Sequence, residues 1–176
     1  MPTVHASVDE LLAPFASALG PDFQGYRNHV QRVLNHYQAL SGRAVLPDAV
    51  LLAAPFHDLG IWTARCFDYL DPSVQLARAH LATQQLERHD HEVTALVMEH
   101  HKLRRYRGPF EASVECYRRA DLVDVSFGLV SFGLPQGHLR TVRAAFPDAG
   151  FHRRLASLTL RQFLRTPLRP LPMLRW

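Results

Sequence analysis

The chain has 176 residues, of which 47% are hydrophobic and 20% charged, the size and balance of one globular domain with its own core. Its formal net charge of +4 comes from segment 151–176, where six arginines occur without an acidic residue; the other 150 residues carry 14 basic and 16 acidic groups. The basic isoelectric point is therefore poor evidence for nucleic-acid binding, and we do not expect a nucleic-acid partner.

Three features of the sequence indicate the cellular compartment in which the protein is expected. No run of about 18 apolar residues occurs, so we expect no membrane span. The first residues lack the basic and apolar regions of a secretory signal. Two cysteines, Cys66 and Cys116, are too few for a disulfide scaffold and suit a reducing compartment. These features predict a soluble cytoplasmic protein.

Apolar residues recur with helical spacing along nearly the whole chain. A short helix is expected from Ser7, and a second over about 23–40, which Gly42 ends. The third segment, residues 49–60, is almost unbroken apolar sequence. It predicts a helix buried on all sides, with Pro55 bending or loosening its last turn.

The second half of the chain continues the helical pattern. Asp71-Pro72 begins a helix that extends to about Leu86. Further helices are expected over about 90–101, 110–125, 136–146 and 151–164. No alternating run is long enough to indicate a strand. We therefore predict an all-α single domain over residues 1–166, followed by a Pro- and Arg-rich strap, residues 167–176, whose prolines prevent a continuous helix.

Eleven histidines are a high number for this length, and histidine is the commonest metal ligand. Side chains of ligand type occupy inward-facing positions on five of the predicted helices, which is how helical bundles build metal sites. These candidates are His29, the pair His57-Asp58, His80, the pair His100-His101, and Asp121. A single inward histidine is more often a hydrogen-bonded core residue than a ligand. The ordered set as a whole favours a metal site.

Helical spacing supports the inward orientation. Asp121 lies four residues after Tyr117 and seven after Val114, on one apolar stripe. His100 continues the apolar stripe of its own predicted helix in the same way. An ionised aspartate such as Asp58, directly after an apolar run, is costly unless a metal or a hydrogen bond compensates it.

Three short segments resemble the signatures of the HD superfamily of metal-dependent phosphohydrolases: HVQRV at 29–33, FHDLG at 56–60 and RADLVD at 119–124. The resemblance implies a single-domain helical bundle of the HD-domain type. It also implies that one divalent metal is bound by the residues that match the ligands of the superfamily, namely His29, His57, Asp58 and Asp121.

A fourth segment, EHHKLRRYRG at 99–108, is similar to the double-histidine segment of HD-GYP cyclic-dinucleotide phosphodiesterases, a dinuclear branch. Lys102 stands where that branch has a glutamate, and Pro109-Phe110 replaces its GYP motif, which argues against cyclic di-GMP as the substrate. The similarity still implies two ions. The further ligands that it implies are His80 and one or both of His100 and His101, with the helical stripe favouring His100.

The predicted ligands also indicate a chemistry. Mixed imidazole and carboxylate ligands suit iron or manganese best, while cobalt, nickel, zinc and magnesium stay open. A bound or bridging water would lose several pKa units and become a nucleophile near neutral pH. Asp58 can bridge two ions, and we predict Asp58, Asp121 and Lys102 as catalytic residues. Lys102, Arg104 and Arg105 follow the ligand helix and are predicted to bind substrate phosphate, although a solvated charged loop explains them equally well.

These inferences predict a phosphomonoesterase or phosphodiesterase that acts on a nucleotide or another small phosphorylated compound. The alternative is a mixed-valent diiron oxygenase of the same superfamily, which cleaves a C–C or C–P bond with O₂. A non-catalytic HD binding module is a third interpretation, against which the complete ligand set argues. The sequence determines neither the substrate nor the oligomeric state, and a homodimer stays open.

Overall fold

Helices make up almost all regular structure in the part of the chain that the computed structural model describes, residues 1–65, 68–167 and 171–174. No β-strand occurs within those ranges, which confirms the predicted all-α class. None of the described helices is long and apolar enough to cross a membrane. The helices are α1 (Ala6–Leu12), α2 (Ala16–Leu19), α3 (Phe23–Ser41), α4 (Asp48–Ala53), α5 (Gly60–Thr63), α6 (Leu70–Thr83), α7 (Asp90–Glu99), α8 (Glu111–Val125), α9 (Gln136–Ala145) and α10 (Phe151–Arg165). Single-turn 3-10 helices precede α2, α3 and α7, at Ala13–Phe15, Gly20–Asp22 and Glu87–His89.

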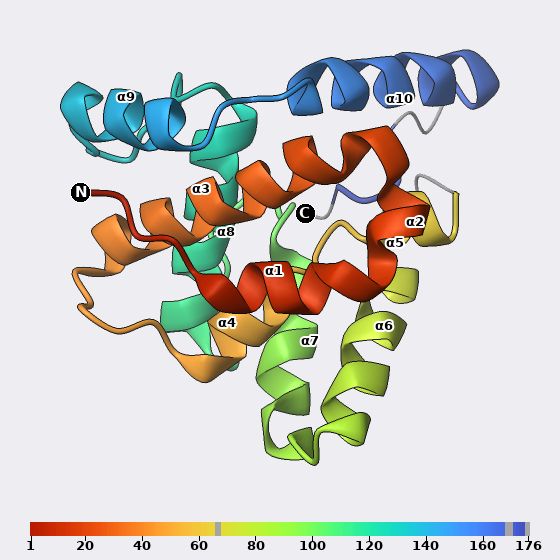
Figure 1. Cartoon of the computed structure of the whole chain (residues 1–176), viewed down its shortest axis with the longest axis horizontal. Coiled ribbons are helices and arrows are strands. Elements are labelled where there is room, and N and C mark those ends of the chain that lie inside the picture. Colours follow the sequence, from red (N-terminus) through yellow and green to blue (C-terminus); the bar gives the residue numbers. More distant parts are fainter. Residues whose placement is uncertain (66–67, 168–170, 175–176) are drawn as a thin grey trace.

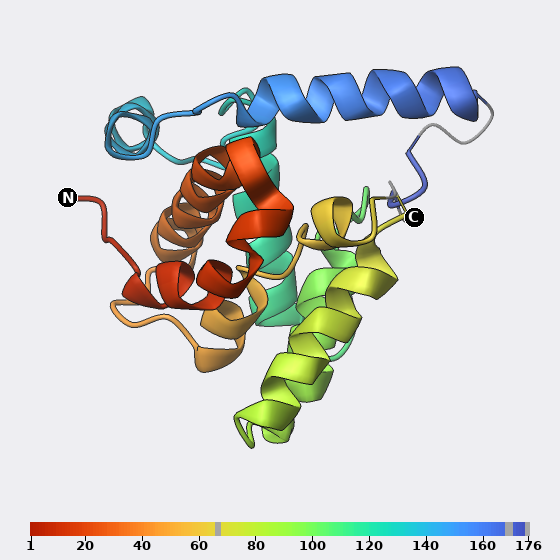
Figure 2. The same cartoon turned by 45° about the vertical axis from the view of Figure 1, so that its right-hand side comes forward.

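The long helix α3 packs along α8 at the centre of the molecule, and Figure 1 shows α8 passing behind α3. Helices α6 and α7 form a hairpin that projects from the lower edge in both Figure 1 and Figure 2. Helix α10 lies along the opposite edge and extends beyond the body of the domain in Figure 2. The amino end of α6 and the carboxyl end of α7 both reach the turn between α4 and α5.

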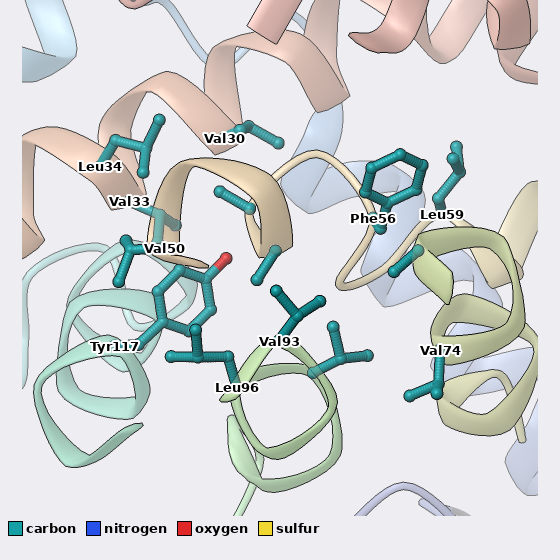
Figure 3. Packing of buried hydrophobic residues seen from close by; sticks show 14 of the residues in the cluster. Val30, Val33, Leu34, Val50, Phe56, Leu59, Val74, Val93, Leu96 and Tyr117 are labelled. Atoms are coloured by element: carbon teal, nitrogen blue, oxygen red, sulfur yellow. The ribbon is translucent and has the colours of Figure 1, made fainter. Parts of the chain in front are cut away.

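An apolar core surrounds this meeting point. Figure 3 shows Val30 and Leu34 of α3, Val50 of α4, Leu96 of α7 and Tyr117 of α8 pointing into one interior. All five are completely buried. Each buried side chain of this size contributes about 1.5–3 kcal/mol to folding, so the core stabilises the domain against the cost of polar groups buried beside it.

The connection between α4 and α5 differs from the predicted single helix over 49–60. The helix ends at Ala53, and residues 54–59 form a tight turn before α5 begins at Gly60. Pro55 explains the break, because proline has no N–H to donate and its ring clashes with the carbonyl of the preceding turn. The His57-Asp58 pair therefore lies in a turn and not on a helix end.

Side chains of α3 and α6 hold this turn from two sides. The buried Tyr26 hydroxyl donates to the proline carbonyl (3.0 Å) and accepts from the Asp58 N–H (3.2 Å). The Gly60 N–H donates to Ser73 Oγ at 2.9 Å. A Cβ atom at Gly60 would lie 2.5 Å from the Tyr69 carbonyl oxygen, so the close approach of α6 requires glycine here.

Half of the predicted C-terminal strap lies outside the described residues, which include 167 and 171–174 of it. Within that part, Met173 is 7% exposed and belongs to the apolar core, and Leu171 packs against the same core. Leu171 and Met173 thus lie on their own domain, whereas Leu174 is exposed.

Candidate metal centre

Ligand-type side chains from four parts of the fold meet in the interior. They are His29 from α3, His57 and Asp58 from the α4–α5 turn, His100 and His101 from the end of α7, and Asp121 from α8. Their side chains are at most 2% exposed, except that of His101 at 18%. The ligand atoms lie within 4.8 Å of one another in two groups, His29/His57/Asp58 and Asp58/His100/His101. This buried cluster could hold a metal ion.

Backbone carbonyls fix the orientation of two of these histidines. Nδ1 of His57 lies 2.6 Å from the Ala54 carbonyl oxygen, and Nδ1 of His100 lies 2.7 Å from that of Val97. A carbonyl oxygen can only accept a hydrogen bond, so each Nδ1 carries a proton. The lone pair of a neutral ring is then on Nε2, which faces the cluster, as in protein metal sites.

The Nε2 atoms of His29 and His57 are 3.0 Å apart. Two lone pairs at this distance repel each other unless a proton or a cation lies between them. Burial lowers the pKa of His29. Burial also opposes protonation of His57, but the carboxylates of Asp58 and Asp121 outweigh it and raise the pKa of His57 to about 9. The metal-free cluster thus retains a proton at the place that suits a cation.

Asp58 stands between two pairs of histidines. Its Oδ2 lies 3.5 Å from His57 Nε2 and 3.8 Å from His29 Nε2. Its Oδ1 lies 3.2 Å from His100 Nε2 and 3.9 Å from His101 Nε2. Burial raises the pKa of the Asp58 carboxyl, but the neighbouring histidines outweigh burial and hold it well below its ordinary value. The carboxylate is ionised and offers one oxygen to each pair.

Asp121 supplies the clearest sign that a group is missing from the hydrogen-bond network. Its buried Oδ1 has no hydrogen-bond partner in the described part of the chain. This oxygen is 3.5 Å from His29 Nε2 and 3.8 Å from His57 Nε2, and Oδ2 is 3.8 Å from His101 Nδ1. Burying a carboxylate oxygen without a donor is costly. A divalent cation would compensate that cost, so the donor set fits a metal.

His101 forms the edge of the cluster. Its Nε2 lies 2.6 Å from the hydroxyl of Tyr69, at the start of α6. Burial and the neighbouring His100 lower the pKa of His101 to about 4, so the ring is neutral near neutral pH. Burial and the Asp58 carboxylate raise the pKa of Tyr69 well above its ordinary value. The phenol therefore keeps its proton and remains able to donate a hydrogen bond.

A third carboxylate, that of Asp124, orients His29 and was not among the predicted site residues. Asp124 Oδ2 lies 2.7 Å from His29 Nδ1, and the Asp124 carboxylate accepts from Arg32 Nε (2.6 Å) and Nη2 (2.8 Å). Burial raises the pKa of Asp124, but these two partners outweigh burial and lower it. A carboxylate behind a metal-ligating histidine fixes the ring and raises its basicity. The sequence feature that could have indicated Asp124 is its position three residues after Asp121, on the same face of α8.

His80 does not join the cluster in this structure. Its ring lies 5.4 Å from that of Phe56, and it belongs to neither ligand group found among the described residues. Tyr69, which contacts His101, precedes His80 by eleven residues, or about 16 Å along a helix axis. Helix α6 thus brings its first turn and not its last turn to the cluster. Apolar spacing shows which face of a helix is buried but not how far along the axis a site lies.

The predicted phosphate-binding residues lie in the loop after α7. Lys102 Nζ is 3.6 Å from a carboxylate oxygen of Glu99, and Arg105 pairs with Glu111 at 3.0 Å. Arg104 is exposed. Two of the three cations therefore lie beside carboxylates of their own domain, and their role in substrate binding stays a prediction.

The fold and the cluster together define a helical domain with a buried histidine and aspartate site that could bind metal. No known protein family, curated protein sequence or solved structure matches the chain. The resemblance to the HD superfamily therefore rests on the sequence segments and on the meeting of His29, His57, Asp58 and Asp121, with which an HD-like site is compatible.

Proposed function

We propose that this protein is an HD-type metal-dependent phosphohydrolase that cleaves a small phosphoester with a metal-activated water. The observation that carries the proposal is the position of Asp58, whose two carboxylate oxygens face two different pairs of histidines. A carboxylate shared in this way would suit two divalent ions, which would supply positive charge for displacement at phosphorus.

The ligands divide between two proposed ions. The first would be held by His29, His57, Asp58 and Asp121, and the second by Asp58, His100 and His101. Iron or manganese is the expected metal, because imidazole and carboxylate donors are mixed. In this assignment His101 takes the role that the sequence resemblance gave to His80.

The chain itself provides orientation and exclusion of water. Divalent ions in the cluster would supply positive charge for a phosphoryl oxygen and lower the pKa of a water molecule. Asp124 and two backbone carbonyls hold three of the histidine rings with Nε2 directed inward. The nearly complete burial of the ligands keeps bulk water away, which strengthens each electrostatic interaction. Tyr69 keeps a proton at its hydroxyl, at the edge where His101 is partly exposed.

The proposal is tested by loading the anaerobically purified protein with manganese or iron(II). Phosphate release is then measured from a panel of nucleotides and of other small phosphomonoesters and phosphodiesters, while oxygen uptake is followed in parallel. We expect hydrolysis that requires the metal, stops on chelation and does not depend on O₂.

Two results would contradict it. Substrate-dependent oxygen uptake without phosphate release would select the oxygenase chemistry that the same ligands allow. Stoichiometric metal binding without turnover of either kind would instead support the non-catalytic module.

A further inference from the structure

A cavity of about 520 Å³ lies between α5 and α10. Ile61 and Trp62 form its wall on the α5 side, and Arg154, Arg161 and Arg165 reach it from α10. The volume falls in the range of about 300–1,000 Å³ that is typical of small-molecule sites. The metal-site proposal makes no use of this cavity.

The cavity is strongly basic. Arg65 joins the three arginines of α10 in its lining, and Asp68 is the one acidic residue among the described residues that line it. Arg154 is neutralised by Asp22, at 2.9 Å. Arg65, Arg161 and Arg165 form no ion pair with a carboxylate in the described part of the chain. Three guanidinium groups thus converge on one space without a carboxylate partner.

The orientation of α10 directs its arginine side toward the cavity. Arg154, Arg161 and Arg165 follow a spacing of seven and four residues, which keeps them on one side of the helix. The solvent-facing side instead carries large apolar residues: Leu160 is 60% exposed and Leu164 73%. An amphipathic helix normally shows its charges to water and its apolar residues to the domain. Here the arginine side borders the cavity.

Aromatic rings separate the cavity from the metal centre. The Trp62 ring lies 4.8 Å from that of Tyr26, and the Tyr26 ring in turn lies 6.0 Å from His57 and 6.2 Å from His29. The Trp62 indole N–H donates to Asp22 at 2.9 Å, which fixes the ring in this position. A ligand in the cavity would touch Trp62 and not the histidines.

We propose that this cavity is a binding site for a small polyanion that carries two or more phosphate groups. Guanidinium groups bind phosphate oxygens with paired, charge-assisted hydrogen bonds, and three cations without a carboxylate partner suit a ligand of several negative charges. The volume of about 520 Å³ suits a small molecule better than a nucleic-acid strand, which needs an extended basic groove. This site stands whether or not the metal centre hydrolyses phosphoesters.

Binding of inorganic tripolyphosphate to the full-length, metal-loaded protein tests the proposal at fixed ionic strength. Calorimetry gives the affinity, and Trp62 fluorescence in a Trp176→Phe background reports on the cavity wall. We expect the double variant Arg161→Gln/Arg165→Gln to bind at least about tenfold more weakly, because it removes two guanidinium groups that would donate charge-assisted hydrogen bonds to the anion.

The matched control is Arg140→Gln/Arg153→Gln, which removes the same charge from exposed positions outside the cavity lining. We expect this control to bind like the parent protein. Equal weakening in both double variants would show diffuse attraction, and no weakening in either would place the anion at the metal centre; both results would overturn the proposal. Tighter, arginine-dependent binding of a single-stranded oligonucleotide would overturn the small-molecule assignment.

Discussion

The Asp58 carboxylate offers one oxygen to each pair of histidines, so its charge is common to both proposed ions. Asp58→Asn keeps the volume of the side chain but removes that charge. We expect the metal content to fall from about two ions per chain to nearly none, with loss of hydrolysis, because two-metal sites depend on the shared anionic ligand. Metal analysis after gel filtration measures this. Asp71→Asn, an exposed change at the start of α6, is the control and should keep both ions.

The structure bears on which histidine would hold the second proposed ion. The sequence resemblance makes His80 a ligand of the second ion, whereas the geometry places His101 beside Asp58 and His80 beside Phe56. We therefore expect His101→Ala to retain about one ion and His80→Ala about two, since a ligand lost from one ion leaves the other in place. A loss of metal in His80→Ala but not in His101→Ala would show that α6 is displaced in the metal-bound protein.

The protonation of His57 gives a prediction for the metal-free protein. Burial lowers its pKa, but the carboxylates of Asp58 and Asp121 outweigh burial and raise it from 6.5 to about 9. A group whose pKa is higher in the folded state contributes its full stabilisation at pH values below its unfolded-state pKa, here about 6.5. This stabilisation is lost as the pH rises through the folded-state pKa of about 9. We expect the free energy of unfolding from urea titrations to fall between about pH 7 and 9.5.

Two controls separate this effect from general alkaline destabilisation. The metal-loaded protein should show a smaller fall, because the cation takes the place of the proton. In His57→Gln the fall should be absent. A metal-free protein that is equally stable at both pH values would refute the proposed proton between the histidines.

At the level of the elements, the α4–α5 turn depends on its contact with α6. A Cβ atom on Gly60 would meet the Tyr69 carbonyl oxygen at 2.5 Å and Ser73 Oγ at 2.9 Å. We expect Gly60→Ala to destabilise the fold by about 1–3 kcal/mol, the usual cost of overpacking, and to weaken metal binding through Asp58. Thermal denaturation checks the first effect and metal titration the second.

Gly137→Ala provides the matched control, since Gly137 lies in α9 and a Cβ there meets nothing within 4 Å. This change should be neutral or stabilise by up to about 1 kcal/mol, because alanine is the better helix former. Equal effects of the two substitutions would mean that the close approach of α6 is unimportant.

The sequence was sufficient for the helical class and for most of the residues that meet in the buried cluster, because helical spacing and the short motifs both act locally. Pro55 was recognised as a perturbation, but whether it bends or ends a helix depends on the packing of the following turn. Asp124 was not predicted because the apolar stripe through Val114 and Tyr117 continues, at helical spacing, to Val125 and not to Asp124; in the structure Asp124 is buried and Val125 only partly so. His80 was placed in the cluster by helical spacing and by the sequence resemblance, neither of which gives the position of α6 along its own axis. That position is decided by tertiary contacts such as those of Gly60.

At the scale of the molecule, residues that follow the segment 29–121, which carries all the candidate ligands, hold parts of the site in position. Arg32 Nη1 donates to the Phe146 carbonyl at 3.0 Å, and the Phe151 ring stacks on His29 with centroids 4.1 Å apart. A fragment that ends at Ala145 retains every candidate ligand but loses both contacts, which hold Arg32 and the His29 ring in place. We expect this fragment to bind metal at least about tenfold more weakly, because partners that orient a ligating histidine contribute strongly to metal affinity. A fragment that ends at Thr166 retains both contacts and should bind normally.

The Arg32 guanidinium also increases the number of residues that must be copied if the cluster is transferred to another protein. A designer who grafts this cluster onto another helical bundle and copies Asp124 must also copy Arg32, which then needs a carbonyl from backbone 22 residues beyond that aspartate. The carbonyls behind His57 and His100 come instead from only three residues upstream in the chain. A graft could instead use such a local carbonyl in place of the aspartate behind His29. It would then not need the helices that follow α8. The His29 ring would, however, lose the added basicity that the aspartate confers on it.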